Sequence, residues 1–205
     1  MIDIQMQLTG ERQPSYLGEV IEQFKRAIAL DPNFPAAYEG LSQALIVVSD
    51  IEQAVSVARR AVELGPSDAD ALLFLAIALF ESGAVAEALE KVEQAVSLNP
   101  VRPPYYNYFH ALILWGNERL QDALEETEEC LRKAPSFGAA EIYRIIILVG
   151  LGRIEEAKAH FAEFFAQPVG TGFIPPRAQG LARRAMAALE TAGWRPTLAA
   201  DREAV

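Results

Sequence analysis

The stretch RAIALDPNFPAAYEGL, from Arg26 to Leu41, has the pattern of one helix ending and another beginning, separated by a proline turn. A proline offers no backbone N–H, and the residue before it is pushed out of the helical region, so Pro32 ends the first helix. Comparable turns occur in ELGPSDADAL, SLNPVRPPYY and RKAPSFGAAE, which place prolines at positions 32, 66, 100 and 135, spaced by 34, 34 and 35 residues. The proline turn is therefore a periodic feature of the chain.

Four alanines recur with the same period. They are Ala54, Ala88, Ala123 and Ala157, separated by 34, 35 and 34 residues. Two markers that agree on one period indicate a solenoid, in which each unit is too small to bury its own apolar face and stacks on its neighbours. We therefore expect the function to lie on an extended surface.

Each period contains two helical patterns. Between Pro35 and Pro66, apolar residues recur at helical spacing, the pattern breaks at Ser49-Asp50, and it resumes from Ile51 to Leu64. In later units the break contains Gly83 or Gly152, and glycine can adopt the positive φ that ends a helix. One period is thus a helix hairpin, and the recurring alanines allow its two helices to cross closely.

The composition limits the classes of partner. With 51% hydrophobic residues the chain is too apolar to be disordered, and a net charge of -10 disfavours nucleic acid and anionic membranes. The most apolar run, Ala71 to Phe80, is half the roughly 20 residues that a bilayer requires. The N-terminal stretch MIDIQMQLTGERQP lacks the features of a secretory signal, and the single cysteine, Cys130, fits a reducing compartment. We expect a cytoplasmic protein without a membrane span.

These features resemble the tetratricopeptide repeat family, whose units carry a large residue early in the first helix, a Leu-small pair, a glycine turn, two alanines and a closing proline. The first two full units meet this pattern at Tyr38, Leu41-Ser42, Ala54, Ala61 and Pro66, and at Leu72, Leu75-Ala76, Gly83, Ala88, Ala95 and Pro100. The resemblance implies an all-α fold, a right-handed superhelical solenoid of antiparallel helix hairpins forming a single domain over residues 1–205. Its expected parts are a half-repeat at 15–32, repeats at 35–66, 69–100, 103–135 and 138–167, and a capping helix at 175–193.

The third and fourth units depart from the pattern. In the third, Tyr106, Phe109 and His110 take the places of the large residue and the Leu-small pair. Cys130 replaces the second alanine there and should be an inert buried thiol. We place the one-residue insertion of this unit around WGNERLQ. In the fourth, Arg144 stands where a buried leucine is expected, and Phe164 stands where the second unit has alanine.

In the tetratricopeptide family the first helices line a concave groove that binds partners. Transferred by position, the resemblance assigns this groove to Glu39, Gln43, Asp70, Phe74, Ile77, Asn107, Tyr108, Ala111 and Tyr143. Such a groove is apolar and aromatic in its middle and acidic at one end, so it fits an apolar or amphipathic helical segment with a basic end. Of the Lys/Arg/Asn clamp with which some relatives hold a terminal carboxylate, only Asn107 is present, so that mode is not expected. The alternative is that these side chains are core, covered by neighbouring helices or by the chain's own C-terminal helix.

No catalytic, metal-binding or cofactor-binding set is expected. His110 and His160 lie in different repeats, no Cys/His spacing suits zinc, and the VGTG glycines lack the lysine of a phosphate loop. The stretch ERLQDALEETEEC is strongly acidic, and we interpret it as a solvated helix face, with a convex patch that docks a basic partner as the alternative. Its carboxylates are Glu118, Asp122, Glu125, Glu126, Glu128 and Glu129, opposed only by Arg119.

Three hypotheses for function follow. The chain is first interpreted as a non-catalytic protein-interaction module or scaffold. It also has a looser likeness to the repeat arrays that end bacterial adenylate cyclases and related multidomain regulators, which suggests the regulatory arm of a bacterial signalling protein. Finally, it could self-assemble as a homo-oligomer such as a homodimer.

Overall fold

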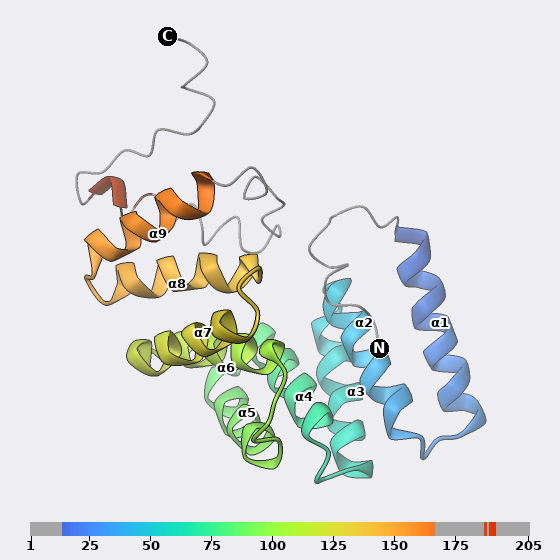
Figure 1. Ribbon diagram of the computed structural model, residues 1–205. Helices are drawn as coiled ribbons and strands as arrows, with labels where there is room; N and C mark the ends of the chain where they lie inside the picture. Colours follow the sequence, from blue (N-terminus) through green and yellow to red (C-terminus); the bar gives the residue numbers. More distant parts are fainter. Residues whose placement is uncertain (1–13, 167–186, 188, 192–205) are drawn as a thin grey trace.

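The computed structural model describes residues 14–166, 187 and 189–191, and the regular elements within these residues are all α-helices. They are α1 (Pro14–Leu30), α2 (Pro35–Val47), α3 (Ile51–Leu64), α4 (Ala69–Glu81), α5 (Val85–Leu98), α6 (Pro104–Gly116), α7 (Leu120–Lys133), α8 (Gly138–Gly150) and α9 (Ile154–Ala166). After α1 the helices form four hairpins, each with a first helix (α2, α4, α6 or α8) and a second helix (α3, α5, α7 or α9). Figure 1 shows them following one another from α1 at one end of the array to α9 at the other.

Each hairpin turn contains one residue with positive φ. Gly83 and Gly152, the two glycines predicted for this role, have φ values of 88° and 72°. The equivalent residues Ser49 and Glu118 adopt the same conformation with φ values of 65° and 62°. A side chain with a Cβ is strained in this region, so the geometry of the hairpin outweighs local preference in these two turns.

The recurring alanines are fully buried. Ala54, Ala88, Ala123 and Ala157 are all 0% exposed, as expected for a close helix crossing. Cys130 is also fully buried, and burial raises the pKa of its thiol to about 12. A thiol with such a pKa is protonated at neutral pH, which makes it an unreactive packing residue.

The inserted residue of the third repeat lies in the loop before α6, so its predicted place around WGNERLQ was wrong. The loops between hairpins are 31–34, 65–68, 99–103 and 134–137, of which only 99–103 has five residues. The α6–α7 turn at 117–119 has three residues, like the other turns within hairpins. Pro104 is the first residue of α6 as Pro35 is of α2, because proline fits the first helical position, where no N–H is needed.

This placement shifts the register of α6 by one residue. The counterparts of Leu72 and Leu75 are therefore Asn107 and His110 rather than Tyr106 and Phe109. Arg144 is the seventh residue of α8 as Leu75 is of α4, so arginine does occupy the leucine position in the fourth repeat. In the third and the fourth repeat, polar residues therefore stand at positions where α4 has leucine.

The fourth repeat accommodates its large Phe164 beside a glycine. A Cβ added to Gly138 at the start of α8 would lie 3.6 Å from the Phe164 ring. This is an ordinary van der Waals separation, so Phe164 of α9 packs beside the start of α8 without requiring a glycine there.

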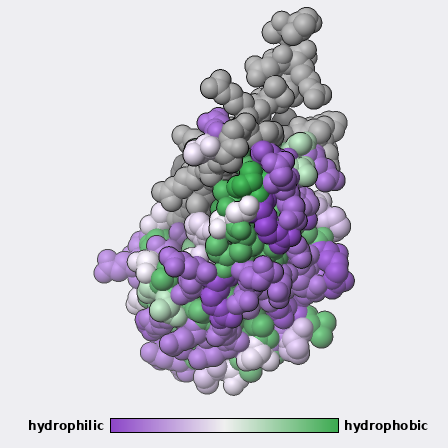
Figure 2. Space-filling model, turned by 90° about the vertical axis from the view of Figure 1, so that its left-hand side faces the viewer, coloured by the Kyte–Doolittle hydropathy of each residue, from purple (hydrophilic) through white to green (hydrophobic). Residues whose placement is uncertain are grey.

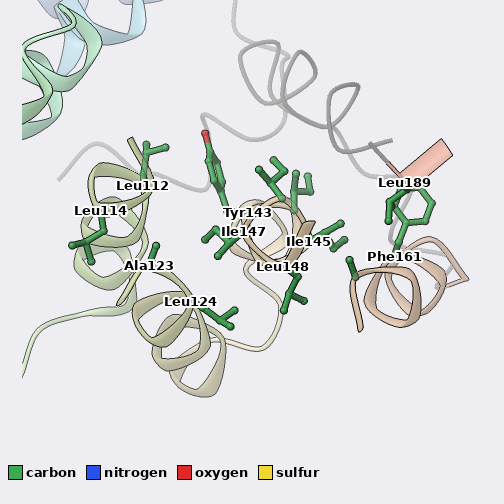
Figure 3. Close-up of a cluster of buried hydrophobic side chains, with 13 residues drawn as sticks. Leu112, Leu114, Ala123, Leu124, Tyr143, Ile145, Ile147, Leu148, Phe161 and Leu189 are labelled. Atoms are coloured by element: carbon green, nitrogen blue, oxygen red, sulfur yellow. The ribbon is translucent and has the colours of Figure 1, made fainter. Parts of the chain in front are cut away.

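Leu189 packs against the last hairpin. It is 0% exposed and belongs to a buried cluster that includes Ile145, Leu148 and Phe161, as Figure 3 shows. The rest of the predicted capping helix at 175–193, apart from 187 and 189–191, lies outside the described residues. The contact of Leu189 covers apolar surface that the last hairpin would otherwise expose.

The surface is mainly hydrophilic where it can be seen. Figure 2 shows one side of the molecule, on which hydrophilic side chains predominate and hydrophobic ones gather near the middle. Among the helices that the structure describes, none is both long and apolar enough to cross a membrane.

Replacing Glu118 with glycine should stabilise the protein. Glu118→Gly removes the strain of a positive φ without removing a buried contact, because Glu118 is exposed. We expect the free energy of unfolding to rise by about 0.5–1 kcal/mol, measured by urea denaturation. The matched control is Gly83→Ala, which should lower it by about 1 kcal/mol, and a Glu118→Gly variant less stable than the wild type would contradict this account.

Candidate functional site

The corrected register defines one face shared by the four first helices. We use the term first-helix face for the residues at the positions that Asp70, Leu73, Phe74, Ile77 and Phe80 occupy in α4. The equivalents are Ala36, Glu39, Gly40, Gln43 and Ile46 in α2, Tyr105, Tyr108, Phe109, Leu112 and Trp115 in α6, and Ala139, Ile142, Tyr143, Ile146 and Val149 in α8.

The predicted groove residues fall into three groups. Four are half-buried and lie on the first-helix face, namely Glu39, Gln43, Asp70 and Tyr108. Three lie on this face and are buried, namely Phe74, Ile77 and Tyr143, at 9%, 5% and 6% exposed.

The remaining two, Asn107 and Ala111, lie off this face. They occupy the positions of Leu72 and Ala76 and are 0% and 1% exposed. Their placement in the groove is corrected because the inserted residue precedes α6 and rotates both away from the shared face. Asn107 instead binds Glu126 of the second helix α7.

Aromatic side chains are prominent on the part of the first-helix face that α6 and α8 form. The Tyr143 ring packs edge-on against Tyr108 and Trp115, with ring centres 5.7 Å and 6.1 Å apart. Tyr105 and Trp115 are half-buried members of this face that the sequence prediction missed. The start of α6 at Pro104, read as a helix-initiating proline, could have identified them.

A cluster of carboxyl groups lies at the other end of this face, and we call Glu39, Asp68 and Asp70 the acidic corner. Burial, followed by repulsion from Asp68 and Asp70, raises the pKa of Glu39 to about 7. Within the described chain no lysine or arginine pairs with Glu39. Glu39 is therefore much more easily protonated than an ordinary glutamate.

Two tyrosines of the next hairpin hold Asp70. The hydroxyls of Tyr105 and Tyr106 donate hydrogen bonds to Asp70 Oδ1 at 3.1 Å and 2.6 Å. Burial first, and then these contacts with Asp70, raise the pKa of both tyrosines above its usual range. The acidic corner is thus built by residues of α2, α4 and α6 together.

A buried polar cluster occupies the opposite side of α6. Arg102 Nη2 donates to both carboxylate oxygens of Glu126 at 2.7 Å and 3.0 Å, and Asn107 Nδ2 donates at 2.5 Å. His110 Nδ1 lies 3.2 Å from Glu126 Oε1, and Lys133 Nζ donates to Asn107 Oδ1 at 2.9 Å. Burial alone would raise the pKa of Glu126, but the close His110 and the bonds from Asn107 and Arg102 outweigh it and lower the pKa to about 2.

Glu126 is therefore an interior residue and does not belong to the solvated acidic face predicted for α7. Its side chain is 18% exposed, compared with 47% for Asp122 on the same helix. The fourth repeat has a related arrangement, in which Arg144 donates to Glu141 at 2.6 Å and His160 Nδ1 lies 3.6 Å from Glu141 Oε1.

The histidine and carboxylate side chains of the described residues do not gather into a metal centre. The two histidines lie in separate hairpins, each beside a carboxylate of the same hairpin. No group of three or more His, Cys, Asp or Glu side chains among the described residues is placed to hold a metal ion. The arrangement is suited to binding through shape, aromatic contact and charge.

Comparison with known proteins identifies the repeats. A family model for the tetratricopeptide repeat matches residues 44–103. The small glutamine-rich tetratricopeptide repeat-containing protein 2 of Mycosarcoma maydis is 28% identical over 122 residues, which cover 60% of this chain and 30% of that protein. The chain spans less than a third of the length of the curated relatives that it matches.

Solved structures confirm the predicted fold class. TTC0263, a tetratricopeptide-repeat protein of Thermus thermophilus, superposes with a TM-score of 0.64 at 20% identity, covering 91% of this chain and 98% of that one. YrrB, described as a tetratricopeptide-repeat protein with an unusual peptide-binding site, has a TM-score of 0.60 at 18% identity, covering 90% and 100%. The looser likeness to adenylate cyclase arrays stays a prediction.

Neutralising Glu39 should stabilise the protein more at high pH than at low pH. A carboxyl whose pKa is raised from 4.5 to about 7 on folding stays protonated in the folded state while it ionises in the unfolded chain. Stability is therefore lost as the pH rises through this window. Glu39→Gln should add about 1 kcal/mol near pH 8, after allowance for partial exposure, and almost nothing near pH 4.

Urea denaturation at the two pH values measures this difference. Glu63→Gln is the matched control, because Glu63 is an exposed carboxylate paired with Arg60. Equal effects of Glu39→Gln at both pH values would contradict the proposed strain at the acidic corner.

Glu126 should make the fold sensitive to acid. Its pKa is lowered on folding from 4.5 to about 2, so its contribution is fully present above pH 4.5 and is lost as the pH falls towards 2. We expect the wild type to lose about 2–3 kcal/mol through this group between about pH 5 and pH 2. The double variant Arg102→Leu/Glu126→Leu should lack this part of the acid sensitivity, because apolar residues can replace a buried ion pair. Parallel acid-unfolding curves for the two proteins would contradict the assignment.

Proposed function

The chain is a tetratricopeptide-repeat protein, and we propose that it is a non-catalytic protein-interaction module that binds an apolar or amphipathic helical segment along its first-helix face. The observation that supports this proposal most strongly is the composition of that face. Half-buried Tyr108 and Trp115 of α6 lie beside Tyr143, away from the acidic corner, whose Asp70 is held by Tyr105. This is an amphipathic surface, and an amphipathic partner would complement it.

The aromatic end would supply most of the affinity. Tyr108 and Trp115 are half-buried residues, and the rings of both contact Tyr143. Rigid aromatic side chains lose little conformational entropy on binding and contribute strongly to interfaces. An apolar stripe of a partner helix would lie against these rings.

The acidic corner would set the direction of the partner. A lysine or arginine at one end of the bound segment would relieve the repulsion among Glu39, Asp68 and Asp70 and favour ionised Glu39. Binding of a basic-ended segment should therefore tighten as the pH rises through about 7, where Glu39 loses its proton. By analogy, the neighbour YrrB is described as having a peptide-binding site.

The proposal keeps two further expectations from the sequence. We place the protein in the cytoplasm, and we retain the regulatory arm of a multidomain protein and the homodimer as alternative settings for the same face. In a regulatory arm, a segment of the larger protein would occupy the first-helix face. In a homodimer, another copy of the chain would occupy it. Light scattering of the purified chain separates the homodimer from the other two.

A synthetic helical peptide tests the proposal. The peptide carries leucines at helical spacing and two lysines at one end, and fluorescence anisotropy measures its affinity near pH 8. Trp115→Ala should weaken binding at least about tenfold, and Glu39→Gln should weaken it about threefold. Val101→Ser is the matched control, because Val101 is 91% exposed and lies on a loop outside this face. Thermal unfolding verifies that each variant is folded.

Two results would contradict the proposal. One is a monomeric wild type that does not bind the peptide, and the other is a folded Trp115→Ala variant that binds it as tightly as the wild type. Phe74 is unsuitable for this test, since it is 9% exposed and a charged substitution there would disrupt the core.

A further inference from the structure

The start of α6 lacks the local hydrogen bond that fixes the start of α4. The N-cap residue of α4, Asp68, accepts hydrogen bonds from the backbone N–H groups of Asp70 and Ala71 at 2.9 Å and 3.2 Å. The N-cap residue of α6 is Pro103, which has no side-chain group that can accept such a bond. The loop before it, 99–103, is also the longest of the four between hairpins. The N-cap residues of α2, α5, α7 and α8 also make no side-chain hydrogen bond, and Pro104 suits the first position of α6. In the longer loop before α6, an interaction outside the cap helps to fix where the helix begins.

Arg102 provides that interaction. Its guanidinium group binds the Glu126 carboxylate at 2.7 Å, and the two side chains are only 15% and 18% exposed. Lys133 Nζ donates a hydrogen bond to the Arg102 carbonyl at 3.1 Å, so both the side chain and the backbone of Arg102 are tied to α7. The adjacent Val101 is 91% exposed, which places the anchor of this loop at Arg102.

The anchor is connected directly to the acidic corner. After Arg102 the chain passes through Pro103 and Pro104, whose rings restrict φ, and reaches Tyr105 and Tyr106. These two residues donate their hydroxyl hydrogen bonds to Asp70. A change in the position of Arg102 is therefore transmitted to the two hydroxyls through a short and stiff segment.

We propose that Arg102 is a positioning residue for the acidic corner, because its pairing with Glu126 sets the start of α6 so that Tyr105 and Tyr106 hold Asp70 beside Glu39. Arg102 itself lies off the first-helix face and makes no contact with a partner there. The consequence for partners rests on the proposed function. Removing the anchor should weaken binding of a basic-ended segment more than binding of a neutral one.

The pKa of Glu39 reports on this arrangement without any partner. Repulsion from Asp70 contributes to raising that pKa, so a displaced Asp70 would lower it. The variant is Arg102→Ala, and NMR titration of the glutamate side chains gives the pKa, with Glu39→Gln used to assign the signal. The expected result is a fall of about 0.2–0.5 in this pKa, because Asp70 is the smallest of its three causes, after burial and Asp68.

Arg132→Ala is the matched control. Arg132 pairs with Glu129 at 2.7 Å, but its side chain is 69% exposed and this pairing stays within α7. This control should leave the pKa of Glu39 unchanged. A folded Arg102→Ala variant with the wild-type pKa at Glu39 would overturn the proposal.

Arg102→Lys decides the matter if Arg102→Ala does not fold. Lysine keeps the charge but cannot present the guanidinium group, so we expect a smaller fall in the same direction, and no fall would overturn the proposal. Peptides with a lysine end and with an uncharged end test the consequence for binding. If neither peptide binds the wild type, the proposed function fails, whereas the pKa measurement still tests the role of Arg102.

Discussion

The close crossing of the two helices in each hairpin is the constraint on which this structure depends. At each crossing lies an alanine with no exposed surface, Ala54, Ala88, Ala123 or Ala157, and a larger side chain would separate the helices. This crossing is kept although the residues around it vary. The first helices all have 13 residues, and the turns within the hairpins all have three. Ser49 and Glu118 have the same positive φ as the turn glycines, although this conformation is strained for residues with a side chain.

Because the hairpin geometry is fixed, the repeats differ from one another in the loops between hairpins and in the side chains that pack between helices. The third repeat takes its extra residue into the loop at 99–103, and this loop carries Arg102 to Glu126. In the same repeat Asn107 and His110 replace the apolar signature residues, and they also face Glu126. A loop insertion, a register shift and a buried polar cluster are thus parts of one local arrangement.

The sequence predicted the fold well because its period is set by steric rules. Proline cannot continue a helix, and alanine is required at the crossing, so their spacing identified the helix hairpins. The inserted residue was misplaced because the spacing between Pro100 and Ala123 locates it only within that interval. The choice within the interval depends on which proline starts α6, and Pro100, Pro103 and Pro104 all lie there.

The candidate site was predicted less completely because the inserted residue was misplaced. Glu39, Gln43, Asp70 and Tyr108 lie half-buried on the shared face, whereas Asn107 and Ala111 were displaced by the one-residue error. The ion pair of Glu126 could not be predicted, because its partner Arg102 lies 24 residues away in a loop of unusual length. Contacts at such separations depend on packing that periodicity does not describe.

The central claim is that the inserted residue precedes α6 and turns Tyr105 and Trp115, rather than Asn107 and Ala111, onto the first-helix face, where we propose that a partner binds. Thiol labelling tests it most directly, with single cysteines introduced as Tyr105→Cys, Trp115→Cys and Ala111→Cys in a Cys130→Ala background. Our account predicts fast labelling of the first two variants and labelling of the third only as quickly as the protein unfolds. Fast labelling at position 111, together with protection at 105 and 115, would contradict it.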